Sequence, residues 1–295
     1  MTASQPLHDE STSLDSTAHL MNRISSQLAS QLSLVALDGR RRPTRPALVV
    51  VAHGSRDPRA LSTVRTLLDR VRELRPGLPV HLGHIELNAP LLPDTLAALD
   101  TDEAVLVPLL LSRGYHVKRD IPEMAAESGV RARVAKALGP HPLLVEALYD
   151  RLMEAGWADT PGTAVVLAAA GSRDPESKVD AGRTASALSE RLGVPVVPAY
   201  ATTAAPRVSD AVQALTARGH HRIAVASYFT APGRFATECA ATAPWMASAP
   251  LGPHPAMARL ILHRYDQCMA TKGAATYLRG AANSATSHQQ PALAT

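Results

Sequence analysis

The pentapeptide Gly54-Ser-Arg-Asp-Pro58 occurs a second time as Gly171-Ser-Arg-Asp-Pro175. Each copy follows a continuous apolar run, at 46–52 and at 163–169, and precedes a helical pattern. A buried parallel strand has this continuous apolar character, and glycine with proline is typical of the turn that ends it. The two copies therefore predict two similar strand–turn–helix units in one chain.

A second repeat supports the duplication. Leu138-Gly-Pro-His-Pro142 recurs as Leu251-Gly-Pro-His-Pro255, 113 residues further on (138 to 251), and the pentapeptides lie 117 residues apart (54 to 171). Solenoid proteins repeat every 20–50 residues or so, which is a much shorter period. The spacing instead indicates a duplicated domain.

The segments between these motifs alternate between strand and helix patterns. In the first half, we expect a helix with the stripe Ala60 to Leu74, then strand 79–86, helix 90–99, strand 103–111 and helix 141–155. In the second half, we expect helix 179–192, strand 194–200, helix 209–218, strand 222–229 and helix 255–268. Alternating elements predict an α/β fold of two similar lobes, each a parallel sheet flanked by helices.

Composition sets the expected domain limits. The 295 residues are 46% hydrophobic, enough for two ordinary cores, which we place at 45–156 and 160–270. The flanking segments 1–44 and 271–295 are rich in small and polar residues, so we expect a flexible N-terminal extension and a flexible tail.

The same composition argues against several classes of function. The net charge is only +4, and a cluster at Arg40 to Arg42 and Arg45 is interpreted as a solvated linker, so no nucleic-acid partner is expected. The two cysteines lack metal-cluster spacing, and no apolar run reaches the ~18 residues of a membrane span. We expect a cytoplasmic protein without a membrane partner. Nucleotide-binding, serine-hydrolase and zincin motifs are missing from the sequence.

Three polar side chains stand at predicted strand ends of the first half: His53, Glu86 and His116. Ligands bind beyond the carboxyl ends of parallel strands, so these three are expected to meet in one cleft. Two imidazoles and a carboxylate suit a divalent first-row metal held briefly, and they could also accept protons from a substrate. Alternatively, the histidines cap helices or bond loop backbone. The second half has Ala170 before its pentapeptide, so its fold does not require a histidine there.

Polar and basic residues surround the two histidines. A helix N-terminus together with such side chains favours an anionic ligand, and we expect these residues to bind a substrate with several carboxylates: Ser55, Arg56, Arg113 and Lys118. The alternative is that some of the cations pair with Asp57 and Asp120 in surface networks.

Three segments resemble the sirohydrochlorin chelatases, which insert a divalent metal into a reduced tetrapyrrole without ATP. They are Val49 to Pro58, His84 to Pro90 and Val107 to Pro122, and the resemblance extends over about residues 45–270. It implies a bilobal fold with the tetrapyrrole in the cleft between the lobes. It also implies no permanently bound cofactor, because the metal is a substrate.

The resemblance also implies roles for individual residues. His53 and His116 correspond to the metal-binding histidines, and Glu86 to the acidic residue of the cleft. His116 or Glu86 would accept the pyrrole protons, while the second half would only wall the cleft. Iron, cobalt and nickel remain open as the metal, and so does the oligomeric state.

Two rival functions are considered. A protoporphyrin- or coproporphyrin-type ferrochelatase shares this architecture, but the repeated pentapeptide and the two first-half histidines favour the sirohydrochlorin type. A non-catalytic carrier would bind a tetrapyrrole or a metal without turnover. An enzyme would form many products per chain, whereas a carrier would only bind its ligand stoichiometrically, so a turnover measurement separates the two.

Overall fold

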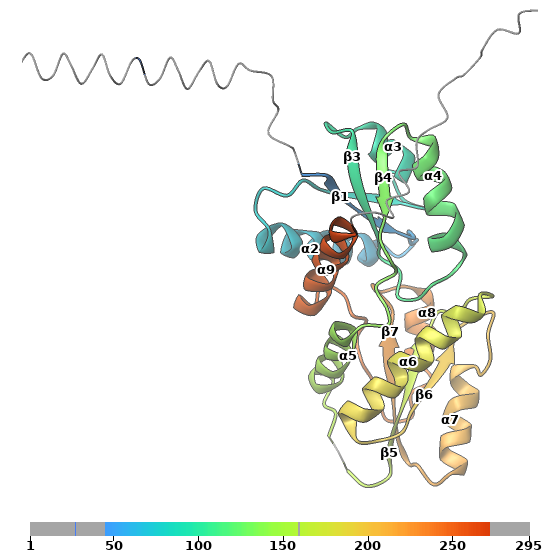
Figure 1. Ribbon diagram of the computed structural model, residues 1–295. Helices are drawn as coiled ribbons and strands as arrows, with labels where there is room; N and C mark the ends of the chain where they lie inside the picture. Colours follow the sequence, from blue (N-terminus) through green and yellow to red (C-terminus); the bar gives the residue numbers. More distant parts are fainter. Residues whose placement is uncertain (1–26, 28–44, 159, 272–295) are drawn as a thin grey trace, which may run out of the picture. The chain divides into compact units, whose positions relative to one another are not determined.

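The computed structural model describes residue 27 and residues 45–158 and 160–271. The expected N-terminal extension and tail lie outside these residues, apart from Gln27 and Thr271. The described chain forms two four-stranded parallel sheets, ordered β2-β1-β3-β4 and β6-β5-β7-β8 (Figure 1). The strands of the first sheet are β1 (Ala47–Ala52), β2 (Val80–His84), β3 (Glu103–Pro108) and β4 (Arg131–Val134). Those of the second are β5 (Thr163–Ala169), β6 (Val196–Tyr200), β7 (Arg222–Tyr228) and β8 (Met246–Ala247). The α/β prediction with two parallel sheets is confirmed.

Helices cover both faces of each sheet. The helices are α2 (Pro58–Leu74), α3 (Leu92–Ala97), the π-helical segment η1 (His116–Asp120), α4 (Ile121–Glu127), α5 (Pro142–Glu154), α6 (Pro175–Leu192), α7 (Val208–Ala217), α8 (Arg234–Ala240) and α9 (Pro255–Ala270). On β1, alternate side chains face opposite layers: Leu48 packs in one cluster with α2, and Val49 packs in another with α3 and α4. This explains why the central strands are apolar throughout.

The backbone of the two halves repeats in detail. Asp57 and Asp174, from the two pentapeptides, cap α2 and α6 by accepting hydrogen bonds from the backbone N–H two residues on. After β2 and β6, each half has one residue with positive φ, Leu87 or Thr203, followed by a cis proline, Pro90 or Pro206. The duplication therefore extends well beyond the two sequence motifs.

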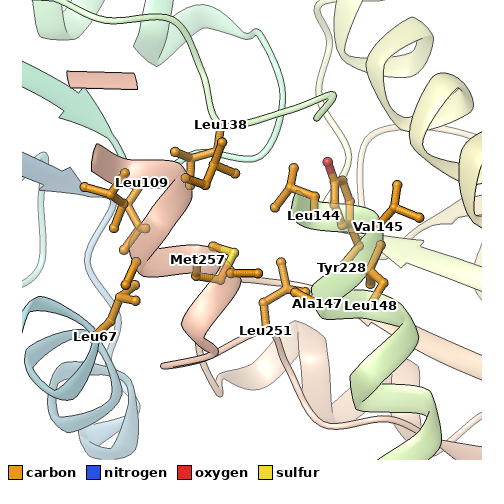
Figure 2. Close-up of a cluster of buried hydrophobic side chains, with 14 of the residues drawn as sticks. Leu67, Leu109, Leu138, Leu144, Val145, Ala147, Leu148, Tyr228, Leu251 and Met257 are labelled. Atoms are coloured by element: carbon orange, nitrogen blue, oxygen red, sulfur yellow. The ribbon is translucent and has the colours of Figure 1, made fainter. Parts of the chain in front are cut away.

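The last helix of each half packs on the other half. Helix α5 contacts α6 and β7 of the second sheet, and α9 contacts α2 and β3 of the first (Figure 1). Figure 2 shows side chains of both helices in one buried cluster, including Leu148 of α5 and Met257 of α9. Helix 141–155 forms at the end of the first half as expected, but it packs on the second sheet. A buried stripe shows that a helix is packed, but not which sheet it covers.

His141 at the start of α5 predicts an acid-sensitive stability. Its Nδ1 accepts a hydrogen bond from Leu143 N (3.1 Å), and burial, with Arg264 and His263 nearby, lowers the pKa of His141 from 6.5 to about 4. Between those values the unfolded chain binds more protons, so stability falls as the pH drops from about 6.5 to 4. Asparagine can still cap α5 but does not titrate in this range. After allowance for solvent screening, we therefore expect the acid-induced fall in the free energy of unfolding to be about 1–2 kcal/mol smaller in His141→Asn than in wild type. Urea unfolding of both proteins at pH 7.5 and 5 measures it, and equal pH dependence would contradict the prediction.

None of the described helices is long and apolar enough to cross a bilayer.

Candidate active site

One large cavity opens where the strands of both sheets end. Its volume is about 890 Å³, and its lining comes from the turns after β1, β2 and β3 and from the corresponding turns of the second half. This volume is typical of small-molecule sites, and the position follows the rule for parallel sheets. His53, Glu86 and His116 all line the cavity, as expected from the sequence.

Gly54 brings the first two of these residues together. Its φ is +105°, and a Cβ there would lie 1.9 Å from the backbone oxygen of Glu86. The N–H of Glu86 donates to the backbone oxygen of His53 (3.0 Å), and the side chains meet with Nδ1 of His53 3.5 Å from Oε1 of Glu86. Only glycine allows this close approach of two turns.

His116 has its own carboxylate. Nδ1 of His116 lies 2.5 Å from Oδ2 of Asp120, one turn further along η1. A carboxylate only accepts hydrogen bonds, so we assign the imidazole proton to Nδ1, which leaves the lone pair of Nε2 free. Asp120 was not predicted as a site residue, although the spacing of four residues on a helical segment indicates the contact.

The two imidazoles face each other edge to face. Their ring centroids are 4.9 Å apart with an interplanar angle of 86°, and their side chains are 43% and 39% exposed for His53 and His116. Among residues 45–158 and 160–271 there is no group of three or more His, Cys, Asp or Glu side chains spaced to enclose a metal. Two open imidazoles suit a metal that enters and leaves, with further ligands supplied by a substrate.

Two neighbours of this pair have structural roles. His84 is buried, its Nδ1 contacts the backbone oxygen of Pro90 (3.1 Å), and burial lowers its pKa. Oδ1 of Asn88 accepts a hydrogen bond from the backbone N–H of Ser55 (2.7 Å), which ties the second turn to the first. Sequence reasoning missed Asn88, and no signal in a single sequence separates it from an ordinary turn residue.

The predicted carboxylate-binding residues divide into two groups. Arg56 is exposed at the cavity, and no described residue pairs with its guanidinium, while Ser55 Oγ accepts from the N–H of Asp57 (3.1 Å). Arg113 and Lys118, by contrast, are ion-paired with carboxylates of the second half. Arg113 also lines the cavity, and substrate contact by these two residues stays a prediction. Their partners are not Asp57 and Asp120, as the alternative supposed.

The second half keeps the turns but not the reactive groups. Ala170 and Thr202 repeat the backbone hydrogen bond of His53 and Glu86, so they stand in for those two residues. Phe235 takes the place of His116, two residues after the matching glycine of its turn. One cation does recur: Arg173, exposed at the cavity, repeats Arg56.

Comparison with known proteins agrees with this arrangement. The CbiX family model matches residues 47–155 and again 164–268. The chain is 30% identical over 174 residues to sirohydrochlorin ferrochelatase of Bacillus subtilis (56% of this chain, 66% of that protein). It is 26% identical over 204 residues to sirohydrochlorin cobaltochelatase of Priestia megaterium (63% and 65%). The chain thus spans just under two thirds of the length of these curated relatives.

A solved structure has the same fold. The sirohydrochlorin chelatase SirB from Bacillus subtilis subspecies spizizenii, in complex with cobalt, superposes with a TM-score of 0.65 at 22% identity, over 79% of this chain and 99% of that one. The two family matches fall on the two halves that the repeated turns define. The chain belongs to the CbiX family, the sirohydrochlorin chelatases.

Proposed function

We propose that this protein inserts a divalent metal, Fe²⁺ or Co²⁺, into sirohydrochlorin. The observation that carries the proposal is the His53–His116 pair, with ring centroids 4.9 Å apart in a cavity of about 890 Å³. The relatives' names add support, since one is a ferrochelatase and the other a cobaltochelatase. The donor types accept both metals, so the choice depends on metal supply.

The site can pass a metal in and take protons out. The metal would bind one ring nitrogen of each imidazole, Nε2 in the case of His116, before it meets the pyrrole nitrogens on one face of the macrocycle. Two pyrrole N–H groups must lose their protons as the metal–nitrogen bonds form. Glu86, 3.5 Å from His53, and Asp120, 2.5 Å from His116, lie where they can stabilise a protonated imidazole. The imidazoles can therefore accept the protons once the metal has left them.

The cavity also has cations for the substrate's carboxylates. Arg56 and Arg173 come from opposite halves at equivalent places in the repeat, both exposed and both lining the cavity. No described carboxylate pairs with either guanidinium, which leaves them available to a ligand. We propose that they bind carboxylates on different edges of the macrocycle.

Arg173→Ala is expected to weaken substrate binding without slowing the chemistry. Losing one charge-assisted contact that is present throughout the reaction should raise the KM for sirohydrochlorin roughly tenfold and leave kcat nearly unchanged. Steady-state kinetics measures both constants. Lys178→Ala, an exposed cation of α6 outside the cavity lining, is the matched control. A KM equal to that of wild type would show that the second half does not bind the substrate through Arg173.

Anaerobic insertion tests the proposed function itself. Sirohydrochlorin is mixed with Fe²⁺ or Co²⁺, with and without the protein, and the change in the visible spectrum gives the rate. A large acceleration over the spontaneous rate supports the proposal, and the faster metal identifies the preferred substrate. If both metals enter at the spontaneous rate, the proposal is wrong.

A further inference from the structure

The loop that carries His116 is held mainly by the second half of the chain. The hydroxyl of Tyr228 at the end of β7 donates to the backbone oxygen of Leu111 (2.9 Å). The hydroxyls of Ser112 and Ser177 are hydrogen-bonded at 2.9 Å. These contacts join the loop after β3 to β7 and to the first turn of α6.

The strongest contact is between Arg113 and Asp180. The carboxylate of Asp180 is completely buried, and it accepts from the backbone N–H of Arg113 (2.9 Å) and from Nε (3.0 Å) and Nη2 (2.7 Å) of the guanidinium. Burial by itself would raise the pKa of Asp180, but the hydrogen bonds from Arg113 outweigh it and lower the pKa. A bidentate contact with a buried carboxylate has one geometry, so it fixes the loop in place.

Lys118 adds a second attachment, two residues beyond His116. Its Nζ lies 2.6 Å from Oδ2 of Asp174 and also contacts Glu176, which in turn binds Arg113 (2.6 Å). We call these five charged residues the clamp: Arg113, Lys118, Asp174, Glu176 and Asp180. It grips the chain on both sides of His116.

The repeat shows that the clamp is specific to this side of the molecule. The pentapeptide alignment puts Arg59 and Thr63 of the first half at the places of Glu176 and Asp180. The aligned loops put Pro232 and Thr237 of the second half at the places of Arg113 and Lys118. The two acidic positions are therefore basic or neutral in the first half, and the two basic positions are neutral in the second half. The loop around Phe235 consequently has no equivalent clamp.

We infer that the second half, which has lost the metal-binding histidines, positions His116 of the first half through the clamp. Asp180 is the principal positioning residue, because it contacts neither His53 nor His116 but fixes the backbone three residues before His116. This inference rests on the proposed function for its effect on the rate, but the ordering of the loop does not depend on it.

Asp180→Asn tests the inference with two readouts. The amide removes one of the two carboxylates that pair with the guanidinium of Arg113 and leaves Glu176 as the other. Amide hydrogen exchange in a peptide covering 111–120 should therefore become at least about tenfold faster. A displaced His116 should lower kcat about 10- to 100-fold, while the KM for sirohydrochlorin stays within about threefold. Glu146→Gln is the control. It breaks a different ion pair, the one that Glu146 of α5 forms with Arg259 of α9, which is not part of the clamp.

A second variant covers the case in which Asp180→Asn does not fold. Lys118→Met removes a half-exposed attachment of the clamp, with side-chain exposure of 42%, and should show the same pattern more weakly. Unchanged exchange in 111–120, or a normal kcat with faster exchange, would overturn the inference. If wild type itself fails to accelerate insertion, the proposed function is wrong, and the exchange measurement still decides whether the clamp orders the loop.

Discussion

His116→Ala is expected to abolish most of the acceleration of metal insertion. The substitution removes one of the two imidazoles that face each other at 4.9 Å and leaves the Asp120 carboxylate without its partner at 2.5 Å. Under the proposed mechanism, one metal contact and one proton acceptor disappear together, and proton transfer by a positioned side chain contributes about 10²- to 10⁴-fold. We therefore expect kcat for insertion to fall at least about 100-fold, measured with both Fe²⁺ and Co²⁺.

A control from the repeat makes this result specific. Phe235 occupies the place of His116 in the second half and also lines the cavity. Phe235→Ala removes a ring from the opposite wall but no metal ligand, so kcat should change only severalfold. Equal losses in the two variants would show that the wall, and not the imidazole, governs the rate.

Gly54→Ala is expected to destroy the site by displacing a turn. The new Cβ would lie 1.9 Å from the backbone oxygen of Glu86, and φ at this residue is +105°. Strain at a positive φ costs about 1–3 kcal/mol, and forced repacking costs a similar amount. The free energy of unfolding should therefore fall by roughly 2–5 kcal/mol, and insertion should stop because His53 and Glu86 separate.

Gly77→Ala is the matched control for that variant. Gly77 also has a positive φ, +79°, but a Cβ there meets no atom within 4 Å. The Gly77→Ala variant therefore introduces backbone strain without a steric clash. We expect its free energy of unfolding to fall by about 1 kcal/mol and its insertion activity to be normal. Urea unfolding and the insertion assay compare the two variants. Similar losses of stability would contradict the steric explanation.

The two histidines could be selected from the sequence because the chain contains two copies of the same fold, which can be compared with each other. His53 and His116 stood out because the second half has Ala170 at the first position and Arg234 or Phe235 near the second. Glu86 was expected at the end of a strand, but β2 ends at His84, and Glu86 lies on the turn that follows. The cavity still brings all three together, because parallel strands end at the same edge of their sheet.

Other features depend on partners that no local pattern identifies. The charges of Arg113 and Lys118 suit a substrate carboxylate as well as a protein carboxylate, and their partners lie about 60 residues further along the chain. The packing of α5 on the second sheet and of α9 on the first could not be predicted either, since the apolar stripe of a helix fits either sheet. Elements without a strong period were also missed, among them β4, α4, α8 and the short β8.

Insertion under excess substrate tests the central claim most directly. A known amount of the protein is given a many-fold excess of sirohydrochlorin and of Fe²⁺ or Co²⁺ without oxygen, and the product is counted per chain. A pair of imidazoles that releases its metal to the macrocycle predicts many turnovers per chain at a rate far above the spontaneous one. Formation of no more than one product per chain, or insertion at the spontaneous rate, would contradict it and indicate a carrier.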